Sequence, residues 1–183
     1  MTTLAQAQGV VAFWREAGHD KWFCKDDGFD GECRDRFGAA MRVALAGGLD
    51  DLRATPEGAL ALLLLLDQFP RNTLRGRAEA FSGDGRARDV AREALSRGFD
   101  LQIPKELQVF AHLPFMHSEN LADQELMVAL ARWRHDADTL KFAEVHRDII
   151  AEFGRFPHRN VALGRSSTAA EAAFLARPDA FKG

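Results

Sequence analysis

One stretch of the sequence, residues 59–76, constrains the fold more than any other. It opens with an unbroken apolar run from Ala59 to Leu66 and changes at Asp67 into the polar sequence Asp-Gln-Phe-Pro-Arg-Asn. A helix that is apolar on all sides is stable only where it is buried on all sides. Polar residues at its end then lie in or beside the core, where they need hydrogen-bonding partners. We therefore predict a central buried helix with a polar site at its end.

The rest of the composition favours a single all-α domain over residues 1–183. Ala, Leu, Arg and Glu are common, whereas Ile, Val, Thr and Tyr, which favour strands, are scarce. The length of 183 residues corresponds to one domain. The spacing of apolar residues and helix signals predicts seven to nine helices and no strand, and the short links between them predict antiparallel neighbours.

Charge and cysteine content limit the classes of binding partner and the cellular compartment that fit the sequence. The 24 Lys and Arg residues nearly balance 27 Asp and Glu residues, which argues against binding of nucleic acid or of an anionic membrane surface. The apolar run is shorter than the roughly 20 residues that a membrane helix needs. Cys24 and Cys33 are predicted to be free thiols, and the N-terminal sequence lacks the pattern of a signal peptide. These features predict a cytoplasmic protein.

Capping residues and prolines predict where the helices begin and end. Thr2 or Thr3, Asp84 and Ser118 can each cap a helix, and Thr168 and Glu171 have the spacing of a capping box. Prolines predict that one helix ends at Pro70 and that Leu113-Pro114 breaks another. The main helices are expected at residues 4–18, 29–45, 56–69, 84–98, 104–112, 118–134, 136–153 and 168–177.

Three polar clusters follow apolar helices, each beside a proline and aromatic residues. They are Asp67, Gln68, Arg71, Asn72 and Arg75; His117, Ser118, Glu119, Asp123 and Gln124; and His158, Arg159, Asn160 and Arg165. The sequence Phe69-Pro70-Arg71-Asn72 is also echoed at residues 156–160 as Phe-Pro-His-Arg-Asn, which predicts a similar local geometry used twice. Polar groups from several segments that meet at helix ends are typical of a ligand pocket.

The residue types suggest roles in such a pocket. Arginine offers a planar fork for a carboxylate or phosphate, and histidine can carry a proton near neutral pH. We assign His117, His158, Asp67 and Glu119 as candidate catalytic residues, with the two acids orienting the histidines. The candidate ligand-binding residues are Gln68, Arg71, Asn72, Arg75, Asp123, Gln124, Arg159 and Asn160.

Structural explanations exist for the same residues. Asp67 and Arg71 have the spacing of an ordinary helical ion pair, and Ser118 fits an N-cap without a nucleophile motif around it. The remaining histidines, His19, His112, His135 and His146, fit ordinary surface or packed positions. The sequence has no recognised motif for zinc, calcium or nucleotide binding, so we predict no metal site and no cofactor.

The blocks around these clusters resemble those of DUF924, a bacterial family of unknown function. The resemblance rests on Leu-Leu-Asp-Gln-Phe-Pro-Arg-Asn, Leu-Pro-Phe-Met-His-Ser-Glu and Gly-Arg-Phe-Pro-His-Arg-Asn, and on earlier aromatic pairs such as Phe13-Trp14. It covers residues 11–175 and implies an all-α fold similar to tetratricopeptide-like helical arrays, with no established activity. Leu52, His112 and Asn120 depart from the family pattern, where a Trp, a Tyr and an acid are usual.

Two functions of different classes follow. In the first, the arginines hold a small anionic ligand and a histidine moves protons, so that the reaction class is hydrolysis or another acid/base step. In the second, the chain is a helical scaffold for a protein partner, and the same clusters are buried ion-pair and capping networks. The pocket is favoured because three separate segments carry more polarity than capping requires.

Overall fold

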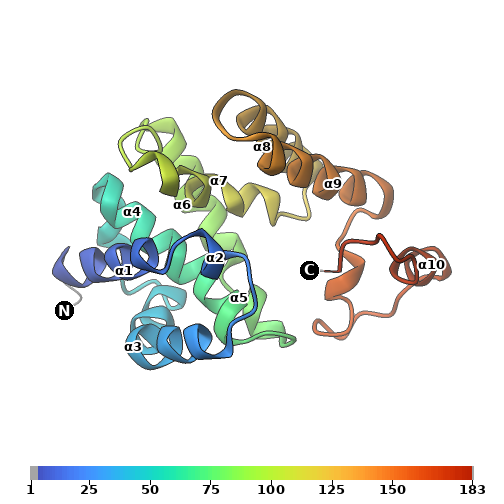
Figure 1. Cartoon of the computed structure of the whole chain (residues 1–183), viewed down its shortest axis with the longest axis horizontal. Coiled ribbons are helices and arrows are strands. Elements are labelled where there is room, and N and C mark those ends of the chain that lie inside the picture. Colours follow the sequence, from blue (N-terminus) through green and yellow to red (C-terminus); the bar gives the residue numbers. More distant parts are fainter. Residues whose placement is uncertain (1–3, 183) are drawn as a thin grey trace. The chain divides into compact units, whose positions relative to one another are not determined.

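The computed structural model describes the backbone of residues 4–182 and the side chains of residues 8–182, and this part of the chain is helical without a strand. The all-α prediction is therefore confirmed, while the cap at Thr2 or Thr3 lies outside the described residues. The helices in chain order (Figure 1) are α1 (Leu4–Ala17), α2 (His19–Trp22), α3 (Asp27–Leu45), η1 (Asp50–Ala54), α4 (Pro56–Leu63), η2 (Leu64–Gln68), α5 (Phe69–Thr73), η3 (Ala78–Phe81), α6 (Asp84–Ser96), η4 (Lys105–Leu107), α7 (Gln108–Met116), α8 (Leu121–Arg134), α9 (Ala137–Phe153), η5 (Pro157–Arg159) and α10 (Ala169–Leu175).

The chain divides into two compact units. Unit 1 comprises Met1–Arg75 and Glu79–Pro114, and unit 2 comprises Gly76–Ala78 and Phe115–Gly183. The assignment of residues 1–183 to one domain and the likeness to tetratricopeptide arrays stay predictions. None of the described helices is both long and apolar enough to cross a membrane.

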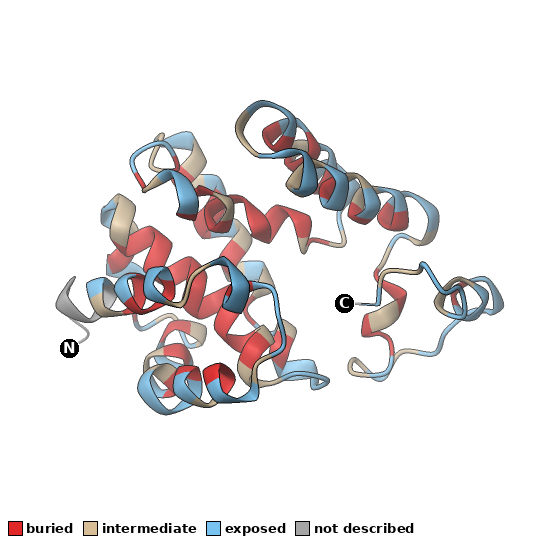
Figure 2. Ribbon diagram, in the orientation of Figure 1, coloured by how far each residue is buried: buried red, intermediate tan, exposed pale blue. Residues whose placement is uncertain are grey.

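The core of unit 1 is built on the apolar run, as predicted. Every residue of Ala59–Leu66 is at most 3% exposed, so η2 and all of α4 after its first turn are buried (Figure 2). Aromatic rings pack around the end of this segment: Trp14 lies 5.5 Å from Phe69 and 5.4 Å from Phe110, measured between ring centroids. Burial of each such side chain contributes roughly 1.5–3 kcal/mol, which fixes the segment as the centre of the unit.

The prediction that this helix ends at Pro70 is wrong, because the helix changes its hydrogen bonding instead. Residues of η2 form a π-helix, in which the Phe69 N–H donates to the Leu64 carbonyl, and α5 continues to Thr73. A proline at position 70 cannot donate to the Leu66 carbonyl. That carbonyl lies against Gly83, where a Cβ atom would be only 2.1 Å from its oxygen. The π-helical turn thus lets the buried helix continue past the proline.

Pro114 also lies inside a helix, so the predicted break at Leu113-Pro114 is wrong. Helix α7 continues to Met116. An interior proline costs about 3 kcal/mol, but Phe110 and Leu113 are buried and their packing offsets this cost.

Two helix caps lie at neighbouring sequence positions and not at the predicted residues. Asn120, not Ser118, caps α8, since its side chain accepts from the Ala122 and Asp123 N–H groups at 2.9 and 3.4 Å. The residue before α6 is Gly83, and Asp84 is the first residue of the helix, where its negative charge still favours the helix start. The capping box of Thr168 and Glu171 is confirmed.

Unit 2 packs two long helices and an irregular segment around a small apolar cluster. Helices α8 and α9 lie against one another, and α10 contacts η5. Ile149, Ile150 and Phe156 are buried at the centre, with Phe153, Phe174 and Phe181 half-buried around them. Gly154 ends α9 in a left-handed conformation with φ 68°, which frees Phe156 and the residues after it from the helix.

Candidate functional site

The first polar cluster lies in unit 1, where Arg71 is held between two carboxylates. Its Nη1 atom lies 2.9 Å from Asp67 Oδ1 and 2.9 Å from Asp84 Oδ1, and it donates to the Asp67 carbonyl at 2.9 Å. Burial alone would lower the pKa of Arg71, but the two carboxylates raise it above its ordinary value. Arg71 therefore stays charged, and its charge is already matched by acids of the chain.

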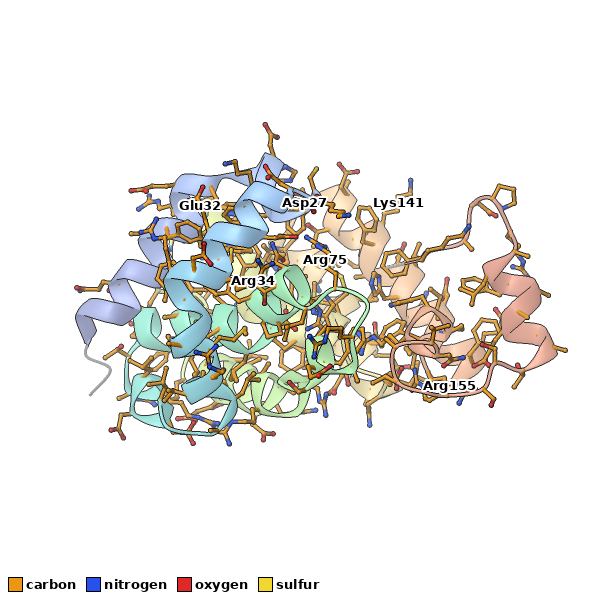
Figure 3. The ribbon with its side chains drawn as sticks, turned by 90° about the horizontal axis from the view of Figure 1, so that it is seen from below. Asp27, Glu32, Arg34, Arg75, Lys141 and Arg155 are labelled. Carbon is orange, nitrogen blue, oxygen red and sulfur yellow. The ribbon has the colours of Figure 1, made fainter. Side chains whose placement is uncertain are left out.

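The other residues of this cluster are also engaged within unit 1. Gln68 donates a hydrogen bond to Asp67, and Arg75 (Figure 3) binds Asp30 with two hydrogen bonds of 2.8 and 3.2 Å. Asn72 is buried, and its Nδ2 atom finds no hydrogen-bond acceptor among the described residues. Neither Asp30 nor Asp84 was assigned to the site from the sequence. The sequence indicated Asp84 only as a helix cap, and nothing local in the sequence pairs Asp30 with an arginine 45 residues away.

In unit 2, Glu119 joins the turn before α8 to the segment after α9. Its two oxygens accept from Arg165 Nη1 and Nη2 at 2.8 and 2.9 Å, and one of them also accepts from the Phe156 N–H at 2.8 Å. Burial would raise the pKa of Glu119, but Arg165 and the Phe156 N–H lower it below its ordinary value. The carboxylate is thus ionised at neutral pH and positions Phe156.

Ser118, Asp123 and Gln124 hold the same turn. The Ser118 hydroxyl donates to Asp123 Oδ2 at 2.7 Å, and the Gln124 amide donates to the Met116 and Ser118 carbonyls at 2.7 and 2.6 Å. All three side chains are at most 4% exposed. The Gln124 bonds satisfy backbone carbonyls that the irregular turn would otherwise leave without partners, and the Ser118–Asp123 bond joins the turn to α8.

A second carboxylate organises the segment around Asn160. Glu171 accepts from Arg155 Nε and Nη2 (Figure 3) at 2.6 and 2.9 Å, and the Asn160 amide donates to Glu171 at 3.3 Å. Arg155, followed by the Thr168 N–H, lowers the pKa of Glu171 to about 2. The sequence indicated Glu171 through its capping box but gave no sign of Arg155.

Protonatable and cationic groups gather around the ring of Phe156. The Arg159 guanidinium lies 4.6 Å from the centre of this ring, and the imidazoles of His146 and His158 lie 5.5 and 5.4 Å from it. Arg159 Nη2 also donates to the His117 carbonyl at 2.9 Å. The structure thus brings His117, His158 and Arg159 together, and we call these three residues with His146 the imidazole cluster.

His146, set aside as an ordinary residue from the sequence, is buried within this cluster. Its Nδ1 atom lies 2.7 Å from the Phe142 carbonyl, which can only accept, so Nδ1 carries the proton. Burial, helped by His117, His158 and Arg159, lowers the pKa of His146 to about 3 against the opposing effect of the Phe142 carbonyl. The electrostatic potential at His146 is therefore positive.

The predicted site residues fall into both units. Asp67, Gln68, Arg71, Asn72 and Arg75 belong to unit 1, whereas His117, Glu119, Asp123, Gln124, His158, Arg159 and Asn160 belong to unit 2. A cavity of about 430 Å³ opens in unit 1 beside Val11, Thr55 and Ile103, and none of the predicted residues lines it. No group of three His, Cys, Asp or Glu side chains among the described residues is arranged to hold a metal ion.

The echoed sequences adopt different backbone conformations, so the prediction of a shared local geometry is wrong. Phe69 is helical, with φ −61° and ψ −41°, whereas Phe156 is extended, with φ −86° and ψ 108°. The first copy continues a buried helix, and the second follows the helix end at Gly154.

Comparison with known proteins places the chain in a family. A solved structure of a protein of unknown function from Agrobacterium tumefaciens shares 45% sequence identity, with a TM-score of 0.90 over 94% of this chain and 97% of that one. No curated protein matches the sequence. The family model described as a bacterial protein of unknown function, DUF924, matches residues 10–179, and the chain therefore belongs to the DUF924 family.

Proposed function

We propose that the protein binds a small anionic ligand through His117, His158 and Arg159 of unit 2. The observation that carries this proposal is that the Arg159 guanidinium and the His158 imidazole both lie on the ring of Phe156, while Arg159 also donates to the His117 carbonyl. Arg159 is only 5% exposed, so its field acts through protein rather than water. A phosphate or carboxylate would find both a fork of hydrogen-bond donors and a positive potential there.

The same residues support an acid/base reaction on the ligand. His117 and His158 are partly exposed, so a bound molecule can reach them. A histidine beside an anion can donate a proton to a leaving group or accept one from water, which is the chemistry of hydrolysis. Glu119 would contribute by fixing Phe156 and Arg165 and not by carrying the proton, because both of its oxygens already accept hydrogen bonds.

For the cluster in unit 1, the contacts favour a structural role over anion binding. Arg71 lies 2.9 Å from both the Asp67 and the Asp84 carboxylate, so its charge is already bound within the chain and attracts an anion less. Arg75 is likewise paired with Asp30. The cytoplasmic location stays part of the proposal, and the free thiols of Cys24 and Cys33 agree with it.

A phosphate titration followed by NMR of the histidine ring protons tests the proposal. Variants that lack one histidine each assign the signals, and all samples are held at one ionic strength with chloride. We expect phosphate to shift the signals of His117 and His158 in a saturable manner and to leave the exposed His19 in unit 1 unchanged. An equal response of all histidines, or no response, would disprove the proposed site.

A helical scaffold for a protein partner remains the second candidate. Its support is an exposed apolar surface in unit 2, where Trp133 of α8 is 84% exposed and Phe142 and Val145 of α9 are 53% and 36% exposed. Exposed aromatic residues are common at protein interfaces. Under this candidate, Trp133→Ala would weaken partner binding and leave the response of His117 and His158 to phosphate intact.

A further inference from the structure

Four aromatic rings of unit 2 form a closed cycle next to Arg159. His146 lies 5.5 Å from Phe156 and 4.4 Å from Phe181, and His158 lies 5.4 Å from Phe156 and 5.3 Å from Phe181, all measured between ring centres. Each imidazole therefore contacts both phenyl rings. A planar apolar group in the position of Phe181 would touch both histidines at once.

The two phenyl rings of this cycle are held in different ways. Phe156 is fully buried, its N–H is bound by Glu119, and Pro157 follows it. Phe181 is half-buried and follows a turn after α10, in which the Ala180 N–H donates to the Arg177 carbonyl at 3.3 Å. Phe156 is therefore a fixed wall of the cycle, whereas Phe181 is attached through its packing on the apolar cluster.

The fixed wall also carries the charge that an anion would seek. The Arg159 guanidinium lies 4.6 Å from the centre of the Phe156 ring, and the same ring is in contact with both imidazoles. A molecule with an anionic group at Arg159 and a planar group attached to it would reach the imidazoles that Phe181 now covers. Its planar group would replace the contacts that Phe181 makes within the chain.

We infer that the ligand is an anion attached to a planar apolar group, and that Phe181 occupies the place of that group until the ligand displaces it. The inference rests on the proposed function, because it takes the anion to bind at Arg159. It adds a chemical class, aryl phosphates or aryl carboxylates, and a reason why binding is controlled by the segment that carries Phe181.

Calorimetric titration with inorganic phosphate and with phenyl phosphate tests the inference. The proteins are the wild type, Phe181→Ala, and Phe174→Ala as the control. Phe174 is half-buried in the same apolar cluster, and its ring packs against that of Phe153 in a tilted arrangement at 5.2 Å between centres. Removal of Phe181 should tighten phenyl phosphate binding about tenfold or more, since a phenyl group then gains a burial site without competition. Phosphate binding should change less than about twofold, and Phe174→Ala should leave the affinity for both probes unchanged.

The outcomes separate this inference from the function on which it rests. If phosphate binds but phenyl phosphate binds no more tightly to Phe181→Ala than to the wild type, the inference is overturned and the anion site stands. If neither probe binds any of the proteins, the proposed function falls, and the inference with it. Phe181→Leu guards against misfolding, because leucine keeps the apolar packing but loses the ring; it should tighten phenyl phosphate binding less than alanine does.

Discussion

Arg71 of unit 1 and Arg159 of unit 2 come from nearly the same local sequence and are used in different ways. Arg71 follows Phe-Pro in a helix and is held by Asp67 and Asp84 at 2.9 Å each. Arg159 follows Phe-Pro-His in a short 3₁₀-helix, where it donates to a carbonyl and lies over an aromatic ring. The segments that precede the two copies decide this difference. A local motif therefore does not determine the role of the arginine within it.

The surroundings also give the two arginines opposite electrostatic environments. Arg71 lies 2.9 Å from each of two carboxylates, those of Asp67 and Asp84. Arg159, together with His117 and His158, lowers the pKa of the neighbouring His146, so positive charge prevails at that imidazole. We expect the residues around Arg71 mainly to stabilise unit 1 and the residues around Arg159 to attract an anion. Variants of each set test this comparison.

Arg71→Met should have the largest effect. It removes the guanidinium that lies 2.9 Å from both Asp67 and Asp84 in a buried site, and loss of one partner of a buried ion pair costs about 3–5 kcal/mol. The free energy of unfolding, measured by urea denaturation, should fall by this amount, while the response of His117 and His158 to phosphate should persist in the folded protein.

Arg97→Met provides the matched control. Glu93 and Arg97 have the same four-residue spacing as Asp67 and Arg71 and a distance of 3.0 Å, but both side chains are about 40% exposed. An exposed helical pair contributes about 0.5 kcal/mol, and the exposed hydrogen bonds of Arg97 to the Arg53 and Ala54 carbonyls bring the expected loss to about 1 kcal/mol. Equal losses for Arg71→Met and Arg97→Met would show that burial does not distinguish the two pairs and would remove the structural role of Arg71.

The sequence predicted the parts of the fold that depend on local signals. The buried run at Ala59–Leu66 and the capping box of Thr168 and Glu171 follow from patterns within a few residues. The helix breaks predicted at Pro70 and Pro114 are wrong because burial of the surrounding side chains offsets the cost of a proline inside a helix. The π-helical turn before Pro70 depends on Gly83, which lies beyond the reach of a local pattern.

The sequence predicted which residue types form the candidate site, but not which residues contact one another. His117, His158 and Arg159 were all assigned, and unit 2 brings them together. His146 and Phe181 were missed because an isolated histidine and a phenylalanine near a helix end carry no signal until the fold places them beside Phe156. Pairing between distant residues, such as Arg75 with Asp30, is a property of the packed chain.

Because it contains the buried His146, the imidazole cluster predicts that the free energy of unfolding depends on pH. The cluster of Arg71 predicts no such dependence. His146 has a pKa of about 3 in the folded chain and an ordinary value of 6.5, so below pH 6.5 the unfolded chain binds a proton that the folded chain does not. Stability therefore falls as the pH falls, by about 1.4 kcal/mol per pH unit from this residue. Between pH 6.5 and 4.5 the free energy of unfolding should decrease by about 2–3 kcal/mol for this reason.

His146→Asn is the variant that isolates this contribution. An asparagine amide can donate to the Phe142 carbonyl, as Nδ1 of His146 does, but it does not titrate. The range above pH 4.5 avoids the carboxylate of Glu171, whose lowered pKa adds a further loss of stability only at more acidic pH. If wild type and His146→Asn lose stability in parallel between pH 6.5 and 4.5, the histidine is not buried in its neutral form.

Glu119→Gln should have a smaller effect than Arg71→Met or the titration of His146, and it refines the description of unit 2. Glutamine keeps an oxygen that can accept from the Phe156 N–H but loses the charge that binds Arg165 through two hydrogen bonds. We expect a loss of about 1 kcal/mol in urea denaturation, near the usual value for one hydrogen bond. Arg159 contributes to the lowered pKa of Glu119, so the carboxylate weakens the positive potential of the cluster, and its neutralisation should leave phosphate binding equal or slightly tighter. A variant that keeps its stability but no longer binds phosphate would instead make Glu119 part of the ligand site and return the proton-carrying role to a carboxylate.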